Sequence, residues 1–342
     1  MTRVFHAGDF DYPLPPDHIA QEPLADRAAS RLLVLERATG AITHRTFPDI
    51  VELIPSGDGL VLNTSRVIPA RLHGKRESGA LAELLLVRPM PDGTWLAMGH
   101  PGGKLKQGRQ VRFGEGDSVV EVVEVLGGGL RKVRFVGALD GRATIAKYGE
   151  VPLPPYIRRA PTAADRERYQ TVYATHDGSV AAPTAGLHFT PDLLNQVRTK
   201  GVAVASLDLH VGPGTFKPVE VDDLGAHPMH PEVLEIPEET ATIVNGRKGV
   251  WAVGTTVVRA LESAADGRGQ VRAGPGETSL FIHSAYEFQV VDRLLTNFHL
   301  PRSTLLMLVC AFGGYEAVMA AYREAVRAGY RFYTYGDAMV IV

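Results

Sequence analysis

The stretch from Thr190 to Leu207 reads TPDLLNQVRTKGVAVASL and passes from a helix to a strand within 18 residues. Thr190 suits the N-cap of a helix, with Pro191 at the first helical position. Leucine and valine then recur at helical spacing until Gly201, which favours the end of the helix. The run at 202–207 predicts a buried strand. A helix followed directly by a buried strand is typical of an α/β protein.

The same alternation continues towards the C-terminus. We expect a strand at 250–253, a helix at about 256–265, an apolar helix capped by Ser303, and an amphipathic helix at 316–327. This pattern predicts an α/β domain in which helices cover a sheet.

A different texture lies between residues 63 and 155. Short runs at 81–87, 94–98, 110–113, 119–125 and 131–136 predict strands bounded by Gly or Pro. This segment holds 14 Lys and Arg against 9 Asp and Glu, a net charge of +5, whereas the rest of the chain has a net charge of −7. Close-spaced strands of this kind favour a small barrel or sandwich.

Composition excludes several classes of protein. Cys310 is the only cysteine among 342 residues, so neither an intramolecular disulfide nor an all-thiolate zinc or iron–sulfur site is possible. The N-terminal residues show no apolar signal core, and the most apolar run, 305–312, is far shorter than the ~20 residues that span a bilayer. We expect a cytoplasmic protein with no membrane partner. The net charge of −2 gives no global indication of nucleic-acid binding.

Histidine recurs in four segments rich in Gly, Pro and Thr, the composition of loops at strand ends. The segments are 181–189, 209–216, 227–232 and 296–301, and they contain His188, His210, His230 with Glu232, and His299. Each histidine alone could simply cap a turn or form a hydrogen bond with a buried backbone group. Four histidines in such loops favour one shared site for proton transfer. His227, His230 and Glu232 could also hold zinc, although their spacing matches no standard helix-borne pair, and we expect no metal.

Two segments could bind anions. Gly212, Pro213, Gly214 and Thr215 resemble a cradle of backbone amides, or only a turn. Thr255, Thr256 and Arg259 follow a strand at the start of a helix, where an anion site or an ordinary capped helix could form. Basic residues gather in two runs that could contact phosphates or form a solvated face: Arg66, Arg71, Lys75 and Arg76, and then Lys104, Lys106, Arg109 and Arg112.

Taken together, these segments resemble the tRNA ribosyltransferase-isomerase family of queuosine biosynthesis. Further matching segments are 19–23, 63–72, 153–157, 169–173, 303–308 and 330–339. The resemblance implies a three-layer α/β sandwich domain at 1–62 and 156–342, with a β-barrel domain inserted at 63–155. It implies S-adenosylmethionine as co-substrate, no metal, and transfer of the ribosyl group to 7-aminomethyl-7-deazaguanine at the wobble position of tRNA. We expect a monomer.

The implied reaction needs a base, an acid and a free amine. We expect His188 or His210 as base and Glu232 as its partner or as the acid, with His230 and His299 nearby. Gly212, Gly214, Thr215, Thr255, Thr256 and Arg259 would hold the co-substrate, and Phe189, Phe216 or Phe298 could stack on adenine or belong to the core. Contacts with tRNA would come from Arg66, Arg71, Lys75, Arg76, Lys104, Lys106, Arg158 and Arg159.

The chain departs from the family pattern at Ala80-Leu81 and at residues 283–285, which read His-Ser-Ala. Two alternatives follow: an S-adenosylmethionine-dependent transferase that does not use tRNA, and a non-catalytic RNA-binding relative.

Overall fold

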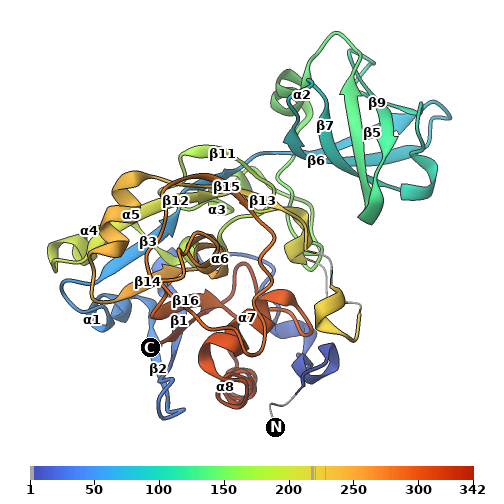
Figure 1. Cartoon of the computed structure of the whole chain (residues 1–342). Helices are drawn as coiled ribbons and strands as arrows, with labels where there is room; N and C mark the ends of the chain where they lie inside the picture. Colours follow the sequence, from blue (N-terminus) through green and yellow to red (C-terminus); the bar gives the residue numbers. More distant parts are fainter. Residues whose placement is uncertain (1–3, 217–218, 220, 228) are drawn as a thin grey trace.

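The computed structural model of the chain describes residues 4–216, 219, 221–227 and 229–342, the side chains of Thr215, Phe216 and Ala226 excepted. A large open sheet with its helices lies beside a small closed barrel (Figure 1). Within the described residues the sheet has nine strands, in the spatial order β15 (Gly274–Thr278), β13 (Glu232–Ile236), β12 (Ala203–Leu209), β3 (Gly59–Asn63), β14 (Val250–Val253), β16 (Arg293–Asn297), β17 (Ala338–Ile341), β1 (Arg31–Leu35) and β2 (Ile42–Thr46).

The central strands of this sheet position the site. Strands β12, β3, β14 and β16 run parallel to one another. Their carboxyl ends, at Leu209, Asn63, Val253 and Asn297, therefore lie at one edge of the sheet. The loops that follow these four strands meet there, which is where open α/β sheets bind ligands.

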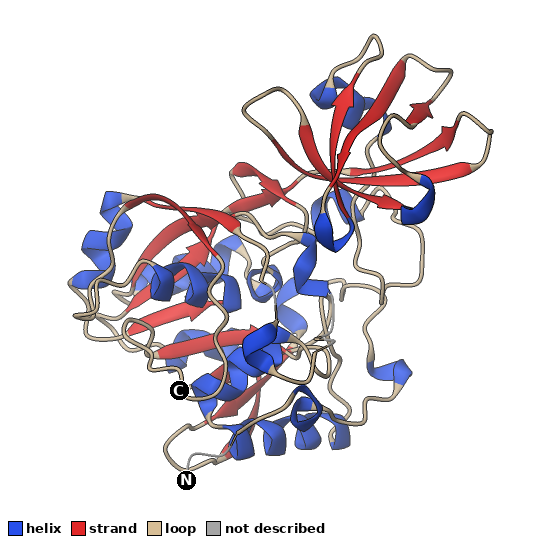
Figure 2. Ribbon diagram, turned by 45° about the vertical axis from the view of Figure 1, so that its right-hand side comes forward, coloured by secondary structure: helices blue, strands red, loops and turns tan. Residues whose placement is uncertain are grey.

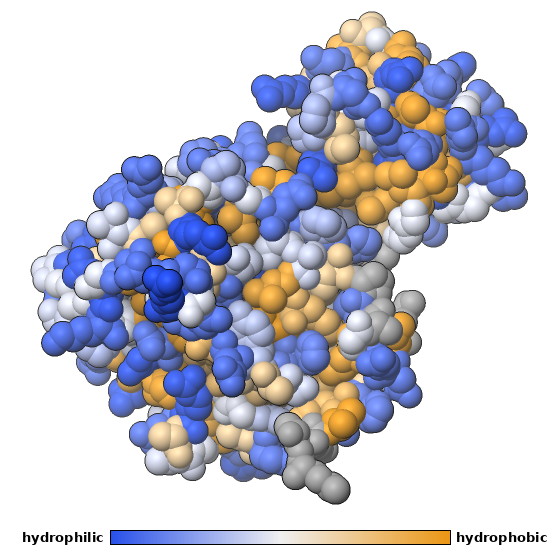
Figure 3. All heavy atoms as spheres, viewed as in Figure 1, coloured by the Kyte–Doolittle hydropathy of each residue, from blue (hydrophilic) through white to orange (hydrophobic). Residues whose placement is uncertain are grey.

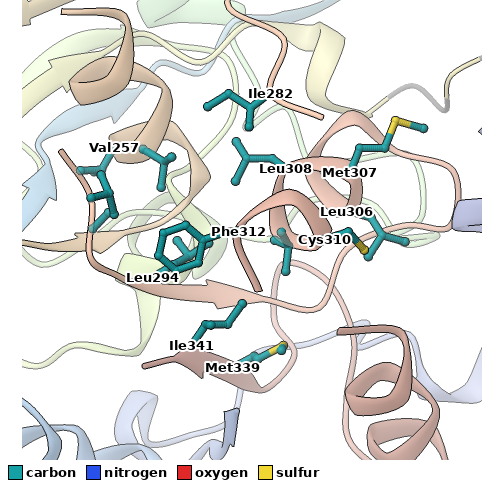
Figure 4. Close-up of a cluster of buried hydrophobic side chains, with 14 of the residues drawn as sticks. Val257, Ile282, Leu294, Leu306, Met307, Leu308, Cys310, Phe312, Met339 and Ile341 are labelled. Carbon is teal, nitrogen blue, oxygen red and sulfur yellow. The ribbon is translucent and has the colours of Figure 1, made fainter. Parts of the chain in front are cut away.

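Helices cover both faces of the sheet, so the expected three-layer α/β sandwich is confirmed. One face carries α1 (Ile50–Leu53) and α4 (Pro191–Thr199), and the other carries α5 (Glu238–Asn245), α6 (Thr255–Ser263), α7 (Thr304–Gly313) and α8 (Tyr315–Arg327). Figure 4 shows Val257, Phe312 and Ile341 packed between helices and strands, and each is at most 2% exposed. Full burial of such a side chain contributes about 1.5–3 kcal/mol.

The predicted N-caps are present. The Thr190 hydroxyl accepts a hydrogen bond from the Leu193 amide at 3.2 Å, and the Ser303 hydroxyl accepts one from the Leu306 amide at 3.2 Å. These bonds satisfy donors that the first helical turn leaves free. No single helix among the described residues has the length and apolarity to cross a bilayer; α7 and α8 reach them only in combination, across a bend of 116°.

The barrel closes from six strands of the described chain, in the order β10 (Leu130–Phe135), β7 (Trp95–His100), β6 (Leu81–Pro89), β5 (Arg71–Arg76), β8 (Gln110–Phe113) and β9 (Ser118–Val125). Alternate residues of each strand point inward, as period-two patterning requires. Where β5 approaches β8, a Cβ on Gly74 would lie 2.7 Å from the Arg112 carbonyl oxygen, so only glycine fits.

The barrel stands apart from the α/β domain (Figure 2), and the face of it seen in Figure 3 carries hydrophilic residues together with a hydrophobic area. The five strands predicted between residues 81 and 136 are confirmed to within two residues at either end. Strand β5 and helix α2 (Gly141–Tyr148) were not predicted, although Asp140 caps α2 by accepting from the Ala143 amide at 2.8 Å. All the barrel strands fall inside the expected insertion at 63–155, whose boundaries stay a prediction.

Candidate active site

A cavity of about 60 Å³ lies at the carboxyl edge of the parallel strands. Its walls come from residues 181–185, the start of α6, residues 296–300 after β16, residues 333–334, and Tyr156. Thr255, Thr256 and His299 line the cavity together. The structure thus brings two predicted co-substrate residues and one predicted catalytic histidine into the same place.

The first turn of α6 forms the anion-attracting side of this cavity. Gly254 precedes the helix with φ of 94°, a conformation that favours glycine. The amides of the first turn have no intrahelical acceptor, and the helix dipole adds partial positive charge. The Asn63 side-chain amide donates to the Thr256 hydroxyl at 3.4 Å and to the Leu209 carbonyl at 2.9 Å, which ties this turn to the sheet edge.

Glu232 and Arg259 form a buried ion pair that does not line the cavity, and Arg259 follows Thr255 by one turn of α6. Arg259 is 3% exposed and Glu232 is 6% exposed, and Nη1 of the arginine donates to Oε2 of the glutamate. Oε1 accepts from the Gly212 amide at 2.8 Å, and Arg259 Nε donates to the Leu280 carbonyl at 3.0 Å. Arg259 Nη2 is buried without a hydrogen-bond partner among the described residues. Glu232 thus acts as the counter-charge of Arg259, and one guanidinium nitrogen is left without an acceptor among the described residues.

His299 lines the cavity. Its Nε2 lies 2.8 Å from the Thr296 hydroxyl, which also donates to the Asn297 carbonyl at 3.3 Å. When the hydroxyl donates to the Asn297 carbonyl, Nε2–H donates to the hydroxyl oxygen and Nδ1 keeps its lone pair. Nδ1 has no hydrogen-bond partner among the described residues. Burial lowers the pKa of His299 to about 3, so the ring is neutral at pH 7.

His188 lies outside this cavity, with both ring nitrogens engaged. Nδ1 is 2.7 Å from the Ser30 hydroxyl, and Nε2 is 3.1 Å from the Asn297 side-chain nitrogen. The ring packs on Phe47 with centroids 5.0 Å apart. Burial, and then the nearby Arg27 and Arg331, lower the pKa of His188 to about 3. A histidine bonded in this way supports its neighbours and has no free nitrogen for a substrate proton.

His210 faces a third environment. Its Nδ1 is 2.8 Å from the hydroxyl of Ser65, on strand β4 (Ser65–Val67), which pairs with β11 (His176–Ser179). A Cβ on Gly178 would lie 2.5 Å from the ring, so the imidazole packs on glycine backbone. The pKa of His210 is lowered, chiefly by burial and also by His176, while the Asp208 carboxylate acts in the opposite direction.

His230 lies between the two domains. Its Cε1 is 3.1 Å from where a Cβ on Gly128 would stand, and its Cδ2 is 3.3 Å from the equivalent point on Gly214. Gly128 belongs to the barrel loop η6 (Gly127–Gly129), and Gly214 belongs to η8 (Pro213–Phe216). The side chains of Thr215 and Phe216 lie outside the described residues, so their predicted roles stay predictions.

The predicted stacking residues differ in position. Phe298 lines the cavity, and its ring packs on Phe332 with centroids 4.9 Å apart. Phe189 is fully buried and meets Phe47 edge to face, with centroids 5.0 Å apart. Phe189 is therefore a core residue.

Six of the eight predicted tRNA contacts have no carboxylate partner among the described residues. Lys75, Lys104, Lys106, Arg66 and Arg158 are exposed, and Arg76 is half-buried. Arg71 instead forms an ion pair with Glu83 at 3.2 Å, and Arg159 donates two hydrogen bonds, of 2.7 and 2.8 Å, to Asp165. Arg71 and Arg159 are thus already paired with carboxylates of the same protein.

A larger cleft of about 960 Å³ separates the barrel from the α/β domain. Arg66 lines it, together with Arg142 of α2 and Arg166 of α3 (Asp165–Arg168), neither of which was predicted. The cavity likewise contains Tyr156, Asn297 and Tyr333, which were missed as site residues. Asn297 lies in the histidine segment at 296–301. Nothing in the neighbouring sequence distinguishes an asparagine that faces a cavity from one in a turn.

Among the residues that the structure describes, no group of three or more His, Cys, Asp or Glu side chains could hold a metal ion. Of the three residues that could have held zinc, His227, His230 and Glu232, two have other contacts: Glu232 binds Arg259, and His230 packs on glycines.

Known proteins resemble the chain over nearly its whole length. The model of the family described as "Queuosine biosynthesis protein" matches residues 7–341. Proteins named S-adenosylmethionine:tRNA ribosyltransferase-isomerase from Heliobacterium modesticaldum and Citrifermentans bemidjiense are each 52% identical over 97% of this chain and 98% of their own. The crystal structure of S-adenosylmethionine tRNA ribosyltransferase from Thermotoga maritima is 39% identical and has a TM-score of 0.55, over 98% of this chain and 100% of that one. The chain belongs to the queuosine biosynthesis protein family.

Proposed function

We propose that this protein transfers the ribosyl group of S-adenosylmethionine to 7-aminomethyl-7-deazaguanine in the tRNA anticodon and isomerises it. The products would be epoxyqueuosine tRNA, adenine and methionine. The observation that carries the proposal is the cavity at the carboxyl edge of the sheet, where the N-terminal turn of α6 faces His299. The names of the relatives, at 52% identity over nearly the full chain, support the same reaction.

The carboxylate and the ribose hydroxyls of the co-substrate suit the α6 side of this site. A carboxylate or a pair of ribose hydroxyls would bind the first-turn amides and the hydroxyls of Thr255 and Thr256. Arg259 Nη2, a buried donor without a partner among the described residues, would donate to the carboxylate. Glu232 would hold the guanidinium in place.

Proton transfer would begin at the carbon next to the sulfonium. The positive sulfur acidifies the ribose CH₂ group, so a neutral imidazole could remove one of its protons. His299 is better placed for this step than His188 or His210, because its Nδ1 has no partner among the described residues and the ring lines the cavity. Adenine would leave with a proton on a ring nitrogen, and the free amine of the modified base would attack the sugar and lose a proton. Methionine would leave when the bond between its sulfur and the ribose CH₂ carbon breaks, with the bonding electrons going to the positive sulfur.

The cavity must open to admit the co-substrate. Its volume of about 60 Å³ is well below the roughly 300–1,000 Å³ of pockets that bind small molecules. Tyr156 and Tyr333, whose ring centroids lie 4.7 Å apart, form one wall and come from two separate segments. Movement of the Tyr156 segment, or rotation of the Tyr333 side chain, would enlarge the site.

The tRNA would lie in the cleft between the barrel and the α/β domain. Arg66, Arg142 and Arg166 line it, are exposed, and have no carboxylate partner among the described residues. Arginines of this kind suit phosphate oxygens.

The test is release of adenine. Enzyme, S-adenosylmethionine and tRNA bearing the precursor base should together yield free adenine and a ribosylated base, detected by chromatography and mass spectrometry. Adenine release that does not depend on tRNA, or no release at all, would refute the proposed reaction.

A further inference from the structure

The side-chain amide of Asn297 is held in one orientation. Its Nδ2 lies 3.3 Å from the Tyr333 carbonyl oxygen and 3.5 Å from the Asp337 carbonyl oxygen. Carbonyl oxygens only accept hydrogen bonds, so the NH₂ group must face them. The reverse orientation would set the amide oxygen against two other oxygens.

This orientation also fixes the tautomer of His188. Because Asn297 Nδ2 donates, His188 Nε2 at 3.1 Å must accept, and the ring proton sits on Nδ1. Nδ1–H then donates to the Ser30 hydroxyl at 2.7 Å, and Ser30 donates its own proton to the Arg27 carbonyl at 3.3 Å. Every donor in the series of hydrogen bonds that joins Ser30, His188 and Asn297 therefore has an acceptor.

One acceptor in this series of hydrogen bonds has no donor. Asn297 Oδ1 is buried and has no hydrogen-bond partner among the described residues, and the whole residue is 1% exposed. Asn297 lines the cavity. A buried amide oxygen without a partner has lost its hydrogen bonds to water with no replacement, so an N–H or O–H group of a ligand would relieve the penalty.

We propose that Ser30, His188 and Asn297 form a relay that presents Asn297 Oδ1 to the exocyclic amino group of the adenine of S-adenosylmethionine. The inference rests on the proposed function and adds the contact that would select adenine over other purines. Phe298, Tyr156 and Tyr333 line the same cavity, and aromatic walls suit a flat heteroaromatic ring. The threonines of α6 serve the sugar and carboxylate on the other side. Asn297 binds the substrate, whereas Ser30 and His188 are positioning residues.

Binding measured by calorimetry tests this contact directly. Wild-type protein should bind S-adenosylmethionine about tenfold more tightly than the analogue whose purine lacks the amino group. Asn297→Ala should bring the two dissociation constants to within about twofold of each other. A variant that keeps the full tenfold preference would overturn the inference.

Variants of His188 test the relay without touching Asn297. His188→Gln keeps a donor and an acceptor but cannot titrate, so the preference for the amino group should persist and turnover should stay within about threefold of wild type. His188→Leu removes both bonds and should reduce the preference, with the shape of the pH–rate profile unchanged. If turnover by His188→Gln instead falls by about two orders of magnitude and the acid limb of that profile disappears, His188 is a proton carrier and the relay is overturned.

The outcomes separate this inference from the proposed function. If wild-type protein discriminates between the two ligands and releases adenine while Asn297→Ala discriminates equally well, only the relay is wrong. If wild-type protein binds neither ligand, the proposed function fails and the inference fails with it. Thermal unfolding of each variant identifies one that has not folded, and His188→Leu then replaces Asn297→Ala as the test.

Discussion

Replacing Glu232 with alanine should destabilise the α/β domain strongly, because it isolates a buried positive charge. Arg259 is 3% exposed, and Glu232 is the only carboxylate that contacts it among the described residues. Breaking a buried ion pair from one side costs about 3–5 kcal/mol. The Gly212 amide, which donates to Glu232 at 2.8 Å, also loses its acceptor. We expect the free energy of unfolding to fall by about 3–5 kcal/mol.

Urea unfolding of a Trp95→Phe background, in which Trp251 of β14 is the remaining tryptophan, would measure this loss by fluorescence. Glu232→Gln should be milder, because its amide oxygen can still accept from Arg259 or from the Gly212 amide. The double variant Glu232→Ala/Arg259→Ala should lose less stability than the sum of its single variants, since neither charge then remains buried alone. As a matched control, Arg327→Ala breaks the exposed pair with Glu324 and should leave the stability almost unchanged. A loss below about 1 kcal/mol in Glu232→Ala would refute the reasoning.

Three further predictions concern ligands and pH. Thr255→Val and Thr256→Val should each raise the dissociation constant for S-adenosylmethionine about fivefold in calorimetry, the value of one hydrogen bond. Arg142→Ala and Arg166→Ala should weaken tRNA binding, and each should lower the slope of log K against log salt by about 0.7–0.9 for every phosphate that the arginine had neutralised. Burial lowers the pKa of His188 from 6.5 to about 3, so unfolded chains bind more protons between these values. The free energy of unfolding should therefore be greatest above about pH 6.5 and fall towards pH 3. His188→Gln should make that decline less steep in urea titrations, and the remainder should come from His299, whose pKa burial also lowers to about 3.

Each of these has a control on the same protein. Thr242→Val, on the exposed side of α5, should leave S-adenosylmethionine binding unchanged, and an equal effect there would show that the α6 threonines do not touch the ligand. Arg327→Ala should leave the salt slope for tRNA as in wild type. A decline between pH 6.5 and about pH 3 as steep in His188→Gln as in wild type would show that His188 does not cause it.

Local signals were enough to predict many of the elements. The caps of α4 and α7 and the alternation in β9 depend on residues within one turn or one strand, so the sequence alone predicts them. Strand β15 reads GPGET and has no apolar alternation. It forms because β13 pairs with it antiparallel, from Glu232 opposite Thr278 to Ile236 opposite Gly274. Such an edge strand depends on a partner more than 30 residues away, which local propensity does not show.

The difference between local signals and contacts with distant residues also explains how much of the site the sequence predicted. Alternating helices and strands imply parallel strands with loops at one edge, and those loops do meet. Within a loop, however, neighbouring side chains diverge. After β12, His210 turns to Ser65, Val211 lines the cavity, and the Gly212 amide donates to Glu232. The chain that leaves β12 therefore divides three adjacent residues among three environments. Residue type cannot predict this division, because it depends on where the strand ends, so histidines that look equivalent in the sequence take separate roles.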